Sequence, residues 1–88
     1  MLHKKKRVKD NGLLADIRLQ RCCVCNSPAP SDCSHIKTRG SGGPDTDWNV
    51  VPKCRMCHIK WGKMGPIRFI EKHPSFGLRL RLLGWSWN

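Results

Sequence analysis

The chain has 88 residues, with 17 Lys or Arg against 6 Asp or Glu, which gives a formal net charge of +11 and limits it to one small domain. No apolar run approaches the roughly 18 residues of a membrane span, and the basic start lacks the apolar core of a secretory signal. Four Trp and six Cys in a sequence with 39% hydrophobic residues exclude collagenous and fully disordered classes.

Short elements are predicted in the first half of the chain. Residues 1–10 are expected to form a basic N-terminal tail, and residues 11–88 a single domain. An apolar stripe over 13–19 predicts a helix that is capped by Asp10 or Asn11. Proline and glycine then favour a loop, interrupted by one short strand over residues 33–37 and followed by a second over 48–51 that Pro52 closes.

Three short helices are predicted in the second half. The first begins near Cys57 and is ended early by Gly62 and Gly65. The second covers residues 67–70, and the third covers residues 78–83. In a domain this small, tryptophan side chains are expected to pack in the core more than to stack on bases. These are Trp48, Trp61, Trp85 and Trp87.

The charge indicates the class of partner. A pI near 10 on one small domain is typical of a nucleic-acid-binding protein. The alternative is a basic protein whose lysines only keep it in solution. An acidic membrane surface is less favoured, because no long segment combines Lys and Arg on one helical face with Trp and Leu on the other.

Two CxxC pairs predict a structural zinc site. Cys22 and Cys25 form the first pair, Cys54 and Cys57 the second, and residues 26–53 lie between them. The tight turn within each pair aims two sulfur atoms at one point, and two pairs complete the tetrahedral S₄ shell that Zn²⁺ adopts in closed sites. The metal would also supply the folding energy that so short a chain lacks.

Disulfides and redox chemistry are the alternatives for these cysteines. Disulfides fit poorly, because a DNA-binding charge without a secretory signal indicates the reducing cytoplasm. A redox CxxC lacks the βαβ pattern that usually surrounds it. Cys23 and Cys33 remain outside the two pairs and are expected to be small buried side chains.

Further motif residues lie between the pairs and just after them: His35, a glycine-rich stretch over 40–43, Asn49, and His58 directly after the second CxxC. In this order they resemble the HNH endonuclease family, and look most like its small phage and bacterial members. The match covers about residues 21–73. The resemblance implies an α+β fold, namely a small zinc-stabilised ββα-metal (His-Me finger) domain with short flanking helices.

The resemblance also implies a role for each of the three residues. His35, on the first strand, would be the general base that deprotonates the attacking water, because imidazole exchanges protons near neutral pH. Asn49, on the second strand, would brace the turn and help to fix the His35 ring. His58, just inside a helix, would bind a catalytic divalent ion (Mg²⁺, Mn²⁺, Ni²⁺ or Zn²⁺) that polarises the scissile phosphate.

Two positions depart from the family pattern. Ser34 stands where close members commonly have a His or Asp that also binds the metal. Gly62 stands where many members have a second helical ligand, one turn after His58. Asp32, or an Asp from the loop over 45–47, is a candidate replacement. Two functions therefore stay open: a metal-dependent endonuclease that hydrolyses DNA phosphodiester bonds, and an inactive zinc-stabilised DNA-binding module of the same fold.

Basic side chains flank the motif, where cations neutralise phosphates without reading bases. DNA is therefore the expected partner, with no membrane and no small-molecule substrate. A third hypothesis makes the chain a zinc-ribbon contact module within a phage packaging or translation assembly. The expected nucleic-acid contacts are Arg39, Lys53, Arg55, Lys60 and Lys63. His3 and His73 carry no motif and are expected at the surface.

Overall fold

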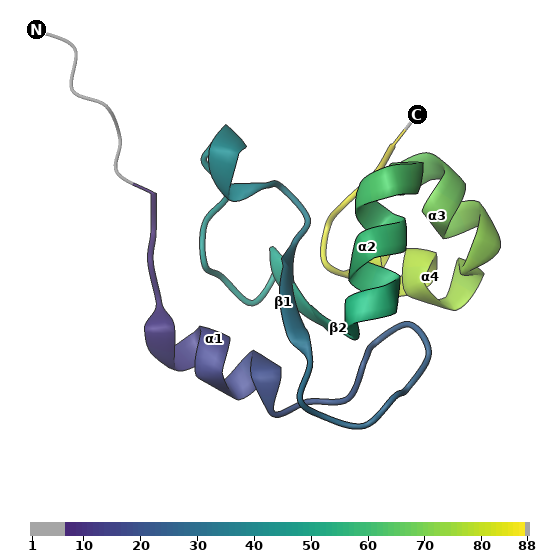
Figure 1. Cartoon of the computed structure of the whole chain (residues 1–88). Coiled ribbons are helices and arrows are strands. Elements are labelled where there is room, and N and C mark those ends of the chain that lie inside the picture. The colour runs from purple at the N-terminus through teal and green to yellow at the C-terminus, as the bar shows by residue number, and fades with distance from the viewer. Residues whose placement is uncertain (1–6, 88) are drawn as a thin grey trace, which may run out of the picture.

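Two short strands near the middle of the chain pair antiparallel, with helices on either side of them (Figure 1). The structure is a computed structural model that describes residues 7–87. Within this range the fold is α+β, as expected from the sequence. Its elements are α1 (Asn11–Arg18), β1 (Asp32–His35), the 3₁₀ turn η1 (Arg39–Ser41), β2 (Val50–Lys53), α2 (Arg55–Met64), α3 (Pro66–Lys72) and α4 (Pro74–Leu82).

Helix α1 begins where the sequence predicts. The carboxylate of Asp10 accepts a hydrogen bond of 2.9 Å from the backbone N–H of Leu13, which satisfies one of the free donors at the helix start. Leu14 and Ile17 lie one turn apart on the same face and are buried together with Val50 of β2. This contact holds α1 against the sheet.

The strands are shifted by one or two residues from their predicted positions. His35 of β1 pairs with Val50 of β2, and Cys33 pairs with Pro52. Pro52 was expected to close the second strand and instead lies within it. A two-stranded sheet has two edges, so a proline without an N–H is tolerated there. The carbonyl of Pro52 accepts a hydrogen bond of 2.9 Å from the backbone N–H of Cys23.

Helix α2 is longer than predicted, because Gly62 does not end it. The helix continues to Met64 and stops at Gly65, which has a φ of 79° and so lies in the left-handed region. A glycine inside a helix costs about 1 kcal/mol relative to alanine, which does not suffice to break a helix whose Trp61 is buried. Helix α3 extends slightly beyond the predicted 67–70 at both ends, and α4 begins at Pro74, before the predicted start at residue 78, and ends at Leu82.

Aromatic rings fill the space between α2, α3 and α4. Trp61 meets Phe69 and Phe76 edge to face, with ring centroids 5.4 and 5.7 Å apart. Trp85 folds back onto α4: its backbone N–H bonds to the carbonyl of Leu80. The predicted packing of the tryptophans is confirmed for Trp61, Trp85 and Trp87, whereas Trp48 is 42% exposed.

Residues 7–10 are not a free tail. Arg7, Val8 and Asp10 all bond to Gly43 or Asp45 in the loop before β2. The part of the expected basic tail that precedes Arg7 lies outside the described residues. Among residues 7–87, none of the helices has the length and apolar character needed to cross a membrane.

Candidate functional site

The four cysteines of the two CxxC pairs, each of which we call a knuckle, converge on one point, as predicted. Their sulfur atoms all lie within 4.8 Å of one another, and the Sγ atoms of Cys25 and Cys54 are 3.7 Å apart. Sulfurs that bind zinc tetrahedrally at about 2.3 Å are separated by about 3.8 Å, so the cluster has the size of an S₄ zinc site. No disulfide links cysteines within residues 7–87. The cluster could therefore hold one structural zinc ion.

Backbone N–H groups orient the sulfurs within each knuckle. The N–H of Cys25 points to Sγ of Cys22 at 3.5 Å, and the N–H of Cys57 points to Sγ of Cys54 at 3.4 Å. The first knuckle turns at Asn26, whose φ of 63° is left-handed, a conformation that asparagine tolerates better than most residues. Cys54 is also the N-terminal cap of α2, so one residue both begins this helix and belongs to the cysteine cluster.

The thiols differ in how readily they ionise. The hydroxyl of Ser27, at 2.7 Å, and its backbone N–H lower the pKa of Cys25 to about 6. Burial, together with the neighbouring thiols, raises the pKa of Cys57. Because zinc binds thiolates, binding of the ion would displace the proton from Cys57.

Lys53 was expected to contact nucleic acid from the surface, but the structure buries it. Its side chain is fully buried, and Nζ donates a hydrogen bond of 2.9 Å to Oγ of Ser34. The ammonium also lies over the rings of Trp61 and Phe76, 4.3 and 4.6 Å from their centroids. Burial lowers the pKa of Lys53 to about 8, and the nearby cysteine thiols act in the opposite direction.

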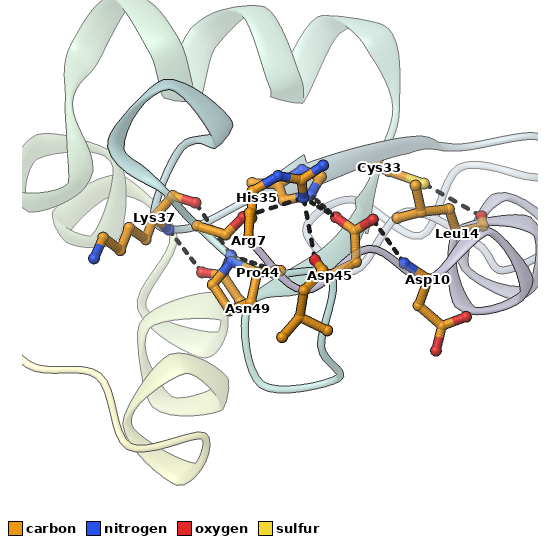
Figure 2. A network of polar contacts seen from close by, with 11 residues as sticks. Arg7, Asp10, Leu14, Cys33, His35, Lys37, Pro44, Asp45 and Asn49 are labelled. Atoms are coloured by element: carbon orange, nitrogen blue, oxygen red, sulfur yellow. Dashed lines mark hydrogen bonds and ion pairs between the residues drawn. The ribbon is translucent and has the colours of Figure 1, made fainter. Parts of the chain in front are cut away.

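His35 lies at the end of β1 and is held by a carboxylate. Its Nε2 is 2.7 Å from Oδ1 of Asp45, and 8% of the side chain is exposed (Figure 2). Burial alone would raise the pKa of Asp45, but hydrogen bonds from His35, the N–H of Asp10 and Arg7 together hold it well below its usual range. A carboxylate at this distance fixes the imidazole ring and leaves Nδ1 as the nitrogen that Asp45 does not contact.

A tight loop brings Asp45 back to His35. Gly43 approaches the carbonyl of Lys37 so closely that a Cβ would lie 1.8 Å from its oxygen. Asn49 braces the same loop: its Oδ1 accepts from the N–H of Lys37, and its Nδ2 donates to the carbonyls of Lys37 and Pro44. The side chain of Asn49 braces the turn as predicted, but the ring of His35 is held by Asp45.

His58 lies in the first turn of α2 and meets a second carboxylate. Its Nδ1 is 3.1 Å from Oδ2 of Asp32, and Arg55 bonds the same carboxylate at 2.8 Å. The hydrogen bond from Arg55 is the main cause of a lowered pKa for Asp32. Asp32 was one of the candidate replacement ligands, and it is the one that adjoins His58.

His35 and His58 line one cleft of about 550 Å³. Arg18 from α1 and Arg39 from η1 line it with them, so the cleft combines two cationic side chains with two imidazoles. Arg18 was not among the predicted site residues, because it belongs to a helix outside the motif. The complete lining is Arg18, Asp32, Cys33, His35, Thr38, Arg39, Gly40 and His58.

Ser34 and Gly62, the two positions that depart from the HNH pattern, have different surroundings. Ser34 has no exposed surface and bonds to Lys53, so its position cannot present a ligand to the cleft. Gly62 is exposed, and nothing lies within 4 Å of a Cβ built there. A side chain at position 62 would stand one helical turn after His58 on α2.

The other predicted contact residues lie at the surface. Arg39, Arg55, Lys60 and Lys63 are exposed, although Arg55 is engaged by Asp32. His73 is half-buried, with its ring centroid 4.5 Å from that of Phe69. Cys23 and Cys33 are partly buried, and Cys33 donates to the carbonyl of Leu14.

Comparison of the chain with protein-family models, with curated proteins and with solved structures finds no match.

Proposed function

We propose that the protein is a metal-dependent endonuclease of the HNH type that hydrolyses DNA phosphodiester bonds. One observation carries the proposal: His35 and His58, each paired with its own carboxylate, line a single cleft together with Arg18 and Arg39. A base, a metal-binding pair and cations for the phosphate are the parts that hydrolysis of a phosphodiester requires.

His35 is the proposed general base. With Nε2 bound to Asp45, Nδ1 can take a proton from water, and the resulting hydroxide attacks the phosphorus. Arg18 and Arg39 would attract the DNA backbone and offset the charge that builds on the phosphate oxygens. The exposed Lys60 and Lys63 would extend this contact to neighbouring phosphates.

The donors beside the cleft fit a divalent ion. A carboxylate oxygen of Asp32 and a ring nitrogen of His58 lie 3.1 Å apart, and this mixed set suits Mn²⁺, Ni²⁺ or Zn²⁺ and, less well, Mg²⁺. Such an ion, when bound, supplies Lewis-acid stabilisation of the phosphate and of the leaving oxygen. Asp32 would have to exchange its bond to Arg55 for the ion.

The cysteine cluster is proposed to hold zinc in a purely structural role. It closes the loop of residues 26–53, which carries the cleft side chains of β1 and η1. Cysteines without disulfide bonds are typical of a reducing compartment, which favours the cytoplasm of a bacterial or phage-infected cell.

A DNA-binding module without cleavage is the second candidate. With no ligand at Gly62, only Asp32 and His58 remain as donors for a catalytic ion, and Asp32 is already bound to Arg55. So small a ligand set favours a protein that binds DNA without cutting it. A contact module of a phage packaging assembly is less supported, because it gives no use to the paired histidines.

Incubation of supercoiled plasmid with the zinc-loaded protein and Mg²⁺, Mn²⁺, Ni²⁺ or added Zn²⁺ tests the proposal. Cleavage with at least one of these ions, lost when the added ion is withheld, is the expected result. Affinity for duplex DNA should fall with salt, with a log–log slope of several units. Salt-dependent binding without cleavage under every condition would favour the second candidate.

A further inference from the structure

Asp45 is contacted from two directions. His35 reaches Oδ1 from the strand side at 2.7 Å, while Nη1 of Arg7 reaches the same oxygen at 2.6 Å (Figure 2). The backbone N–H of Asp10 donates to Oδ2 at 3.0 Å, and the N–H of Asp45 donates to the carbonyl of Val8 at 2.8 Å. Residues 7–10 thus enclose this carboxylate, and we refer to them as the N-terminal strap.

The strap removes the carboxylate from water. Only 1% of the Asp45 side chain is exposed, and 17% of Arg7. A carboxylate so buried is stable only when its oxygens are paired. Arg7 also donates to the carbonyl of Gly43 at 3.3 Å, so the guanidinium spans both the acid and the loop that carries it. Without Arg7, Asp45 would lose a charged partner and a restraint on its orientation.

We propose that Asp45 and Arg7 are positioning residues for His35, with the N-terminal strap acting through Asp45 to hold the imidazole in one tautomer. The inference rests on the proposed function and assigns an order to the proton transfer. Asp45 accepts the Nε2–H of neutral His35, which leaves the lone pair of Nδ1 to take a proton from water. The hydroxide so formed makes the new P–O bond, and the bond to the leaving oxygen breaks.

A purely structural strap would act differently. It would hold residues 7–10 against the domain, and its loss would lower stability without changing which nitrogen of His35 carries the proton. The position of the proton on the His35 ring therefore distinguishes a positioning role of the strap from a purely structural one. Nitrogen NMR of ¹⁵N-histidine-labelled, zinc-loaded protein reads the protonation of each ring nitrogen and needs no cleavage.

Asp45→Asn is the first variant. A carboxamide can donate to Nε2, so we expect the proton of His35 to move to Nδ1 and the single-turnover cleavage rate to fall by about 10²–10⁴-fold, with substrate affinity within about threefold. An NMR pattern that keeps the proton on Nε2, in a variant that folds as the native protein does, would overturn the inference.

Arg7→Gln and its matched control Lys9→Gln keep the test decisive if Asp45→Asn does not fold. Both changes remove one positive charge from the strap, and Lys9 is exposed. Arg7→Gln should mix the two His35 tautomers and lower the cleavage rate by about tenfold, while Arg7→Lys restores part of it. Lys9→Gln should change only the salt dependence of binding. Equal effects of Arg7→Gln and Lys9→Gln on tautomer and rate would overturn the inference.

Failure of the proposed function is a separate result. If the native protein cuts DNA with none of the ions, the nuclease proposal fails, and the NMR measurements alone decide on the positioning. A His35 tautomer that depends on Asp45 and Arg7 then supports it, and one that ignores both contradicts it.

Discussion

Nζ of Lys53 donates a hydrogen bond of 2.9 Å to Oγ of Ser34 on the opposite strand, and neither side chain has exposed surface. The ammonium lies over the ring of Trp61, and the thiols of Cys22 and Cys57, one from each CxxC pair, act with that of Cys23 to raise its pKa against the effect of burial. A zinc ion with four thiolates carries a net charge of −2, so a buried cation beside it offsets part of that charge. This places Lys53 with the metal site.

Lys53→Met should weaken zinc binding. Methionine has a similar length but no charge, so the cluster loses its buried counter-ion and Ser34 loses its partner. We expect the zinc dissociation constant to rise about tenfold and the free energy of unfolding to fall by about 1–3 kcal/mol. Competition with a chromogenic chelator measures the first and urea unfolding the second. Lys60→Met, the same change at an exposed position of α2, is the control, and equal zinc affinity in both would contradict this role.

Removal of Cys54, one of the four clustered cysteines, should unfold the domain. The pure protein is expected to contain one zinc ion per chain, and Cys54→Ser should lose it together with the N-terminal cap of α2. Metal analysis measures the zinc content of each protein, and circular dichroism measures the loss of helix. Cys33→Ser, a thiol change outside the cluster, should retain the zinc. A folded native protein without zinc would refute the metal site.

Gly43→Ala should be the most damaging glycine substitution in the loop. A Cβ there meets the carbonyl oxygen of Lys37 at 1.8 Å, and backbone cannot move aside as a flexible side chain can. We expect a loss of about 2–4 kcal/mol in the free energy of unfolding. Gly40→Ala, with open space around it, should stay within about 0.5 kcal/mol. Urea unfolding measures the stability of both variants, and equal free energies of unfolding would show that the close approach of Gly43 to Lys37 is absent.

Gly62→His should be tolerated and should strengthen binding of the catalytic ion. The position is open, and its side chain would stand one turn after His58. If ligands limit the site, the concentration of Mn²⁺ or Ni²⁺ needed for half-maximal cleavage should fall by about tenfold or more. Gly62→Ala is the control: it should raise helix stability by about 0.5–1 kcal/mol and leave the metal dependence unchanged. The same metal dependence in both variants would mean that Asp32 and His58 suffice.

The cluster of four cysteines could be predicted from the sequence because each CxxC turn aligns two sulfurs by itself. The meeting of the two pairs is not local, but it follows from the four ligands that a tetrahedral metal site needs. The helices after Cys54 were also largely predictable, since proline and glycine mark their ends. The length of α2 was not, because the burial of Trp61 outweighs the cost of Gly62.

The pairing of His35 with Asp45 could not be predicted in the same way. It depends on a loop that closes only because Gly43 approaches the backbone of Lys37. The contact of Arg7 with Asp45 joins residues 38 positions apart, and no local pattern marks it. Lys53 was misplaced for a related reason: a lysine among other basic residues suggests a surface, and its burial follows from the rings that surround it.

The most direct test of the account is the single-turnover cleavage rate of His35→Ala, measured together with its affinity for the same DNA. The side chain of His35 contacts Asp45 and no cysteine of the zinc cluster, so the variant should fold and bind DNA. We predict a rate about 10²–10⁴-fold below that of the native protein at unchanged affinity, while His73→Gln, a histidine outside the cleft, keeps the native rate. A His35→Ala variant that cuts DNA as fast as the native protein would contradict the central claim.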